Sequence, residues 1–188
     1  VVRPLLHSVK GIGFGQGVFP FYSDLDAYWM ASAGIDLAVR SAICAACNPE
    51  KIALLDNFCW CSSTEPERLW ELERAARACY DFAKAYNIPF ISGKDSMFND
   101  FKGFNAENNP VKISVPPTLL ASSIGIVDDS TTCISMDLKM DGDLVYLIGG
   151  TRAELGASEY GRMIAEKNGT NAIGGNVPTL PDTRTAWN

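Results

Sequence analysis

The apolar positions of the chain fall into short runs that predict strands. Each run spans a few residues and is bounded by polar or turn-forming residues, which favours buried strands over helices. The polar segment 101–109 between two of these runs is expected to be a loop. The predicted strands are 51–56, 89–91, 112–115, 119–127 and 144–148.

Two longer segments have helical periodicity. Apolar residues recur about every 3.6 positions from Asp24, the expected N-cap, to Cys47. A capping box that starts at Thr64 and has Pro66 in its first turn opens a second helix, which is expected to end near Ala85. A short third helix is expected at 158–167. The residues expected to face inward are Tyr28, Ala31, Ile35, Ala38, Val39, Ala42 and Ile43 on the first helix, and Leu69, Leu72, Ala76, Cys79 and Ala83 on the second.

Glycine occupies every second position from Gly11 to Gly17. In a strand, this spacing leaves one face without side chains, so that another backbone or a ligand can come close. A disordered linker is the alternative interpretation.

The order strand, helix, strand over 51–91 indicates a crossover unit, so the chain is expected to have an α/β (or α+β) fold. If its two strands run parallel, their carboxyl ends lie at one edge of the sheet. That edge would hold Asp56 and the segment Ser92–Ser96, which is expected to begin a loop that carries Lys94, Asp95, Ser96, Asn99 and Asp100. Its cationic, anionic and hydroxyl side chains behind one glycine could gather phosphate and a divalent ion. A solvated turn is the alternative, as is a capping or turn role for Asp56.

This loop does not have the Walker A pattern. Ile88 stands where that pattern requires its first glycine, and Asp95 rather than Ser or Thr follows Lys94. Any phosphate bound here is therefore held in a different way. A second charged pair, Asp36 and Arg40, is either a surface ion pair or faces a cleft.

The composition narrows the classes of partner. The net charge of −6 argues against general binding to nucleic acid or to anionic membranes, and no apolar run approaches the roughly 18 residues of a membrane span. Of the six cysteines, the pairs Cys44/Cys47 and Cys59/Cys61 suggest zinc, but their spacing and apolar context favour core thiols in the reducing cytoplasm.

A charged segment centred on Gly142 is a candidate domain boundary. We expect a first domain over 1–138 and a second over 143–188. About 45 residues with one strand and one helix cannot bury a core alone, so the second domain is expected to be truncated. The chain begins with Val1 and is expected to be cut from something longer.

Five motifs in register resemble phosphoribosylformylglycinamidine synthase, the ATP-dependent carbon–nitrogen ligase of purine biosynthesis. The resemblance covers nearly the whole chain and is weakest in the Gly/Asn-rich tail. The motifs are the segments Tyr22–Tyr28, Asn48–Asn57, Ser92–Ser96, Pro116–Leu120 and Gly149–Ser158.

The resemblance implies a whole N-terminal domain of the aminoimidazole-ribonucleotide-synthetase type, with a mixed sheet flanked by helices, followed by the start of the C-terminal domain. It implies the second of the two related halves of the synthetase. It also implies binding of ATP or ADP with Mg²⁺ and of formylglycinamide ribonucleotide. The expected partners are the other half or a second copy, docked through the sheet, and a glutaminase that supplies ammonia.

Residue by residue, the resemblance assigns ATP binding to Asp56, Gly93 and Lys94, and substrate binding to Ser96. An ammonium cannot ligate a cation, so Lys94 is expected to contact phosphate, and Asp95 or Asp36 to hold the metal. No catalytic residue is expected here, because the only histidine, His7, does not match the family's catalytic histidine.

Two alternatives stay open. The chain can be a scaffold half that holds a nucleotide without doing chemistry, which Lys94 in place of a metal ligand favours. It can also be a related enzyme such as an aminoimidazole ribonucleotide synthetase.

Overall fold

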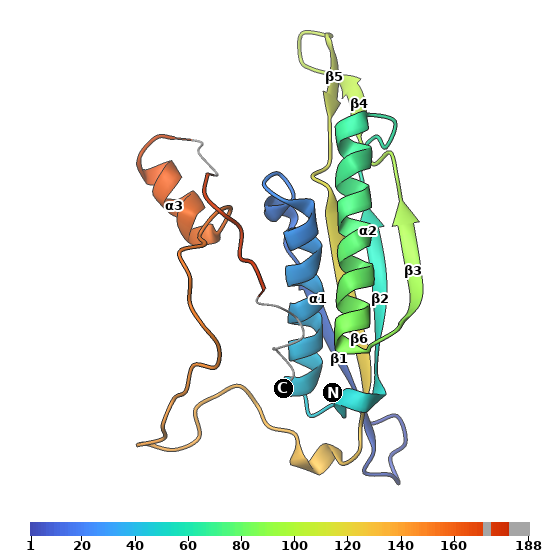
Figure 1. Ribbon diagram of the computed structural model, residues 1–188, viewed down its shortest axis with the longest axis vertical. Coiled ribbons are helices and arrows are strands. Elements are labelled where there is room, and N and C mark those ends of the chain that lie inside the picture. Colours follow the sequence, from blue (N-terminus) through green and yellow to red (C-terminus); the bar gives the residue numbers. More distant parts are fainter. Residues whose placement is uncertain (171–173, 181–188) are drawn as a thin grey trace.

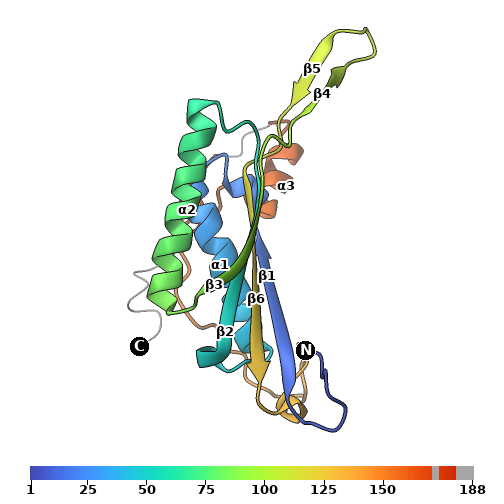
Figure 2. The same cartoon turned by 90° about the vertical axis from the view of Figure 1, so that its right-hand side faces the viewer.

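In the computed structural model, which describes residues 1–170 and 174–180, one mixed sheet is covered on one face by two helices (Figures 1 and 2). The strand order is β1-β6-β2-β3; β6 runs antiparallel to both β1 and β2, and β2 runs parallel to β3. This confirms the expected mixed α/β architecture. The main elements are β1 (Gly11–Val18), α1 (Ala27–Cys44), β2 (Ile52–Cys59), α2 (Pro66–Tyr86), β3 (Phe90–Ser96), β4 (Phe101–Phe104), β5 (Pro110–Ile113), β6 (Thr118–Val127) and α3 (Glu159–Lys167), with short 3₁₀ turns η1 (Pro20–Tyr22), η2 (Pro49–Lys51) and η3 (Ser130–Thr132).

The alternating glycines lie on the face of β1 that packs against α1. A Cβ on Gly15 would lie 2.2 Å from the carbonyl oxygen of Ala38, and one on Gly17 would lie 2.1 Å from that of Gly34. Both distances are far below van der Waals contact. The expectation of a close backbone approach is therefore confirmed, the neighbour is a helix, and the linker interpretation is wrong.

The helix starts differ from the predicted ones. Asp26, not Asp24, caps α1, and its carboxylate accepts the backbone N–H groups of Tyr28 and Trp29. Before α2 the N-cap is Glu65 and makes no side-chain cap, so the Thr64 capping box does not form. Several neighbouring residues before each helix are of types that can cap it. The path by which the chain enters the helix decides which of them does so.

The buried stripe of α1 agrees with the predicted one, whereas that of α2 is rotated. The side chains Ala31, Ile35, Ala38, Val39 and Ala42 are buried as predicted. On α2, Leu69 is 53% exposed, and the buried residues are Ala75, Ala78, Phe82 and Tyr86. Two aromatic rings toward the C-terminal end set this rotation, since Phe82 and Tyr86 pack edge to face at 5.6 Å between their centroids.

The segment before residue 101 and the predicted loop 101–109 also differ from expectation, since β4 forms within that loop. Strand β3 continues through Ser92–Gly93 to Ser96, so this segment is not a loop, and it is an exposed edge strand rather than a buried one. Residues 101–113 form the hairpin β4–β5, which extends beyond the end of the main sheet (Figure 2). Pairing with β2 explains why β3 persists despite its polar composition.

The chain after η3 contains α3 but no strand among its described residues, so the predicted strand 144–148 is wrong. The side chains from Leu144 to Ile148 are 77–89% exposed. Their apolar pattern is typical of a strand, but a strand requires a neighbour to pair its backbone groups. Helix α3 forms as predicted, with Ser158 as its cap, and lies apart from the sheet (Figure 1). The proposed boundary at 138–143 stays a prediction, and part of the tail, 171–173 and 181–188, lies outside the described residues.

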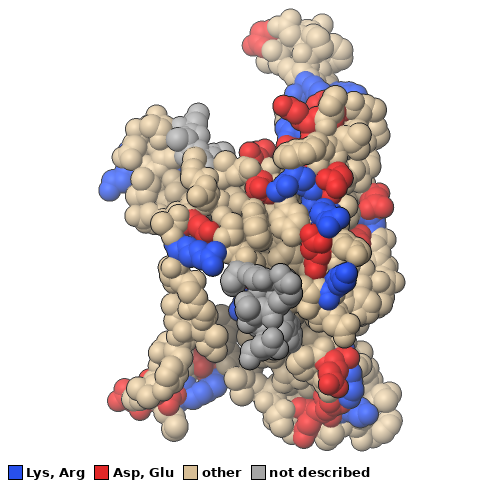
Figure 3. Space-filling model, in the orientation of Figure 1, with Lys and Arg blue, Asp and Glu red and all other residues tan. Residues whose placement is uncertain are grey.

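The face of the sheet opposite the helices is open. Phe14 on β1 is 54% exposed, and Val18 and Ile126 on the same face are also exposed. No helix among the described residues is long and apolar enough to cross a bilayer. Figure 3 shows positive and negative side chains interspersed over α2, so this face of the molecule carries no extended basic patch.

Candidate functional site

The structure brings the two predicted strand segments together. Strands β2 and β3 are parallel neighbours, and Asp56 pairs directly with Gly93. The pairing is possible because α2 forms the crossover between them. A shift in register after Leu54 sets which residues of β3 face which residues of β2. Asp56 and the segment 92–96 are therefore neighbours, as expected, but Asp56 does not end its strand, because β2 continues to Cys59.

The carboxylate of Asp56 occupies the space where a side chain on Gly93 would be. A Cβ at Gly93 would lie 2.3 Å from Oδ1 of Asp56 and 2.8 Å from its Oδ2. A side chain at this position would therefore displace the Asp56 carboxylate, which lies at the end of a flexible side chain.

The environment of Asp56 raises the pKa of its carboxyl group. Burial is the main cause and the negative charge of Asp95 the second, while the backbone N–H of Lys94 donates to the carboxylate and lowers the pKa. Asp56 also raises the pKa of Cys79 on α2, whose thiol reaches a pKa of about 12 chiefly through burial. Asp56 therefore lies on the helix-covered side of the sheet.

Lys94 and Ser96 lie on the opposite, open side. Successive side chains of a strand alternate between faces, and Lys94 pairs with Asn57 whereas Gly93 pairs with Asp56. The ammonium of Lys94 donates a hydrogen bond to the hydroxyl of Ser96, and both residues are at the surface. The expected phosphate-contacting residues are thus divided between the two faces of one edge strand.

The two candidate metal ligands differ in their surroundings. Both oxygens of Asp36 are engaged: Oδ1 accepts from the Tyr86 hydroxyl at 2.7 Å, and Oδ2 pairs with Arg40 at 2.5 Å. This geometry disfavours Asp36 as a ligand. Asp36 and Arg40 form an ion pair on α1, and both line a cavity of about 320 Å³, as the cleft interpretation expected. Asp95, by contrast, is exposed and close enough to Asp56 to raise its pKa.

Asp56 and Asp95 could hold a magnesium ion together with phosphate oxygens. Magnesium sites on nucleotides commonly use one or two carboxylates and complete the shell with phosphates and water. The repulsion between these two carboxylates is the feature that a bound cation would relieve. No group of three or more metal-ligating side chains occurs among the described residues, so the fit depends on phosphate oxygens.

The cysteines do not form a zinc site among the described residues, and all six are free. Cys47 and Cys61 are buried as the core-thiol interpretation predicts, whereas Cys44 is exposed. Cys59 lies on the open face opposite Ser96, and the amide of Asn99 donates to its sulfur at 3.4 Å.

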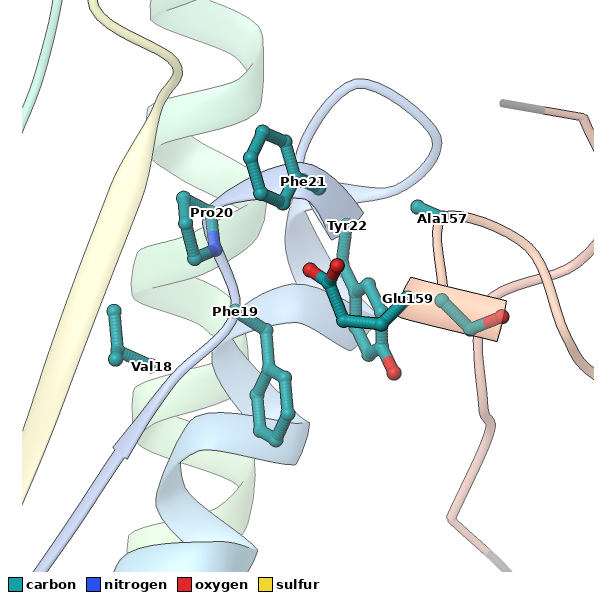
Figure 4. Close-up of a pocket in the computed structure, with 8 residues that line it drawn as sticks. Val18, Phe19, Pro20, Phe21, Tyr22, Ala157 and Glu159 are labelled. Atoms are coloured by element: carbon teal, nitrogen blue, oxygen red, sulfur yellow. The ribbon is translucent and has the colours of Figure 1, made fainter. Parts of the chain in front are cut away.

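A cavity of about 330 Å³ lies elsewhere, between η1 and the start of α3 (Figure 4). Its lining is mostly apolar and aromatic, with Glu159 as the one charged residue among Val18, Phe19, Pro20, Phe21, Tyr22, Ala157 and Ser158. Among the described residues that line it there is no cation, although the guanidinium of Arg162 lies 4.3 Å from the ring centroid of Phe21. None of the candidate ligand residues lines it, whereas Tyr22, Ala157 and Ser158 belong to two of the five motifs.

Two of the residues expected in the polar loop, Asn99 and Asp100, have surroundings that the sequence did not predict. The amide of Asn99 donates to the backbone oxygen of Ser96 at 2.8 Å, and Asp100 is buried with its side chain only 1% exposed. Both lie in a polar segment without periodicity, where nothing in the pattern distinguishes a buried carboxylate from a solvated one.

Comparison with known proteins identifies the family of this chain. No protein-family model matches the chain. Phosphoribosylformylglycinamidine synthase subunit PurL of Thermococcus sibiricus is 31% identical over 166 residues, which are 87% of this chain and 21% of that protein. The PurL subunit of Methanothrix thermoacetophila is 28% identical over 188 residues, covering 96% of this chain and 22% of that protein. This chain is PurL-like.

A solved structure supports the fold. The Thermotoga maritima PurL structure in complex with FGAR superimposes with a TM-score of 0.52 at 18% identity, covering 70% of this chain and 19% of that one. At this identity the likeness concerns the fold alone. The resemblance inferred from the five motifs is confirmed, and the chain spans about a fifth of the length of the PurL relatives that it matches.

Proposed function

We propose that this chain supplies a nucleotide-binding strand pair and a docking sheet to a phosphoribosylformylglycinamidine synthase. That ATP-dependent ligase of purine biosynthesis converts formylglycinamide ribonucleotide and glutamine-derived ammonia to formylglycinamidine ribonucleotide. The observation that carries the proposal is the in-register pairing of Asp56 with Gly93, which places a carboxylate beside an exposed strand backbone and its cationic neighbour.

The residues have distinct roles in this proposal. Asp56 and Asp95 hold Mg²⁺ against the phosphates of ATP or ADP, and the bare backbone at Gly93 allows the nucleotide to approach. Lys94 and Ser96, on the open face, contact the phosphate of a nucleotide or of the formylglycinamide ribonucleotide substrate; T. maritima PurL is known in complex with FGAR. Asp36 is left out of the metal site because both of its oxygens are engaged.

The chemistry is the activation of an amide by phosphoryl transfer. ATP phosphorylates the amide oxygen of the substrate, and ammonia then displaces phosphate to give the amidine. Such a reaction is accelerated chiefly by positioning and by neutralising the charge of the transferred group, which Mg²⁺ supplies when bound. On the open face, Lys94 supplies a positive charge for the phosphate of the substrate ribonucleotide, and the Ser96 hydroxyl orients that substrate.

The open face of the sheet is the proposed docking surface for the other half of the synthetase or for a second copy. Its strands β1 and β6 carry exposed apolar side chains, which a second sheet would cover. A glutaminase is the further proposed partner, and the cytoplasm the proposed location. The isolated chain is expected to lack turnover, since it has no histidine that matches the catalytic one.

Calorimetric titration of the chain with ADP and Mg²⁺ tests the proposal. We expect binding by the native chain and a loss of at least about tenfold in affinity on Asp56→Asn, because the carboxylate then no longer holds the metal. Gln16→Ala, on the open face of β1, is the matched control and should bind as the native chain does. No binding by the native chain, or equal binding by Asp56→Asn, would refute the proposal.

A scaffold half that holds a nucleotide without doing chemistry is the second candidate. The position of Lys94 favours the scaffold. Lys94 and Asp56 lie on opposite faces of the sheet, so one phosphate group cannot contact both side chains. Nucleotide that co-purifies with the chain and resists exchange supports the scaffold. Competition by formylglycinamide ribonucleotide that is lost in Ser96→Ala supports the catalytic assignment.

A further inference from the structure

The hairpin β4–β5 is not held in place by apolar packing. It forms a sheet of its own beyond the end of the main sheet (Figure 2). Its large apolar side chains, Phe101, Phe104 and Ile113, are 55–67% exposed. An isolated two-stranded hairpin is only marginally stable in water, so other contacts must fix its position on the body of the molecule.

Lys112 on β5 provides such a contact. Its ammonium nitrogen lies 2.5 Å from Oε1 of Glu65, the residue before α2, and 3.3 Å from Oδ2 of Asp100, the residue before β4. One cation therefore ties the hairpin to the start of α2 and to the hairpin's own base.

The contact with Lys112 matters because the carboxylate of Asp100 is buried. Its side chain is 1% exposed, and neither of its oxygens accepts a hydrogen bond among the described residues. Lys112 is the cation that pairs with it in this part of the chain. Only the carboxylate of this pair is buried, since the Lys112 side chain is 37% exposed. Removing Lys112 therefore leaves a buried charge without its cation, which is more costly than the loss of a pair between two exposed groups.

Asp100 is directly connected to the proposed ligand site. The preceding residue, Asn99, donates from its side chain to the backbone oxygen of Ser96 at 2.8 Å and from its backbone to the carbonyl of Trp60 at 3.0 Å. Phe98 in the same turn has a left-handed backbone, with φ of 59°, and its N–H donates to the carbonyl of Cys61 at 3.2 Å. A side chain at positive φ is strained and persists only where its surroundings hold it.

We propose that Lys112 is a positioning residue: by neutralising buried Asp100 it holds the turn 97–100 against β2, and through Asn99 it fixes Ser96 and its partner Lys94 for anion binding. The positioning of Ser96 rests on the proposed function, whereas the fixing of the turn does not. If Lys112 is absent, Asp100 turns toward water, Asn99 is displaced, and the strained backbone at Phe98 relaxes.

Amide hydrogen exchange of the full chain tests the fixing of the turn. In Lys112→Met, the N–H groups of Phe98 and Asn99 should exchange at least about tenfold faster, while the N–H of Leu54, bonded to the carbonyl of Pro89 at 2.8 Å, is unchanged. The matched control is Lys102→Met. Lys102 faces Lys112 across the hairpin and makes no ion pair with a described residue, so its loss should change neither amide.

Two further variants separate charge from packing. Lys112→Arg keeps the cation and should retain slow exchange. In the Lys112→Met background, Asp100→Asn removes the buried charge and should slow the exchange again. If exchange in Lys112→Met equals that of the native chain, or if Asp100→Asn does not reverse the acceleration, the proposed role of Lys112 is wrong.

Titration with ADP and Mg²⁺, with inorganic phosphate as a second probe, tests the link to the ligand site. Lys112→Met should lower the affinity by about tenfold in parallel with the faster exchange, since disorder in the turn lowers the fraction of binding-competent molecules. Faster exchange with unchanged affinity would overturn the positioning of Ser96. A native chain that binds neither probe would refute the proposed function, and the exchange rates would still decide whether Lys112 fixes the turn.

Discussion

A close backbone contact between β1 and α1 leads to a prediction for Gly15→Ala. The added methyl group would lie 2.2 Å from the carbonyl oxygen of Ala38, 2.7 Å from the hydroxyl of Ser123 and 2.9 Å from Cβ of Ser41. The first of these atoms belongs to helix backbone, which cannot rotate away as a side chain can. Gly15 does not have a positive φ, so alanine fits the backbone conformation and the effect is steric.

The magnitude follows from three contributions. Overpacking a well-packed interior costs about 1–3 kcal/mol. The Ser123 hydroxyl donates to Ala38 at 2.7 Å in the core, and breaking that bond leaves buried polar groups unpaired at about 1–3 kcal/mol. Reduced entropy of the unfolded chain returns about 0.4–1 kcal/mol. We therefore expect a loss of about 2–5 kcal/mol, a large fraction of the total stability of an ordinary domain.

Urea denaturation followed by tryptophan fluorescence measures this loss, since Trp60 is fully buried in the native state. Gln16→Ala is the matched control, because the next residue along β1 faces the open side and its truncation should cost less than about 0.5 kcal/mol. A Gly15→Ala chain within about 0.5 kcal/mol of the native one would show that α1 can withdraw freely, and would refute the close-packing argument.

Three other changes test the site and the open face. Gly93→Ala places a methyl group 2.3 Å from Oδ1 of Asp56, so ADP affinity should fall by about tenfold in a calorimetric titration; unchanged affinity would separate Asp56 from the phosphates. Burial, and then Asp95, raise the pKa of Asp56, so the folded state holds this proton more tightly than the unfolded state, and stability should fall as the pH rises from near 3.8 through the raised pKa. Asp56→Asn should remove that part of the slope in denaturation curves recorded across this range; an unaltered slope contradicts the assignment. Phe14→Glu should weaken self-association by at least about tenfold in analytical ultracentrifugation, and a native chain that stays monomeric at high concentration would argue against docking of a second copy through the sheet.

Local periodicity predicted most of the elements around the core. The apolar stripe of α1 and the alternating glycines of β1 each describe a face, and the structure places those two faces together. The resemblance to phosphoribosylformylglycinamidine synthase could also be drawn from motifs alone. The sequence was most informative about packing where a residue differs in size from its neighbours, as each glycine of β1 does.

Two predictions, the strand at 144–148 and the loop at 92–96, are wrong for the same physical reason. Whether a segment is a strand depends on a pairing partner, and the partner is distant in sequence. Five apolar residues from Leu144 stay exposed without a neighbour, whereas the polar segment from Ser92 becomes a strand because β2 lies beside it. The apolar content of a segment indicates only how readily it would be buried. Whether it pairs as a strand depends on which other segments the fold places beside it.

The amino-acid sequence by itself determined which segments are helical, which face of β1 is bare, and that Asp56 and the segment 92–96 belong to neighbouring units of the chain. Only the tertiary structure decided that Lys94 and Asp56 point to opposite faces, that Asp36 is fully engaged, and that Asp100 is buried beneath a hairpin. The physical reason is that side-chain direction and burial depend on strand register and on contacts between residues far apart in the chain, which local spacing does not encode.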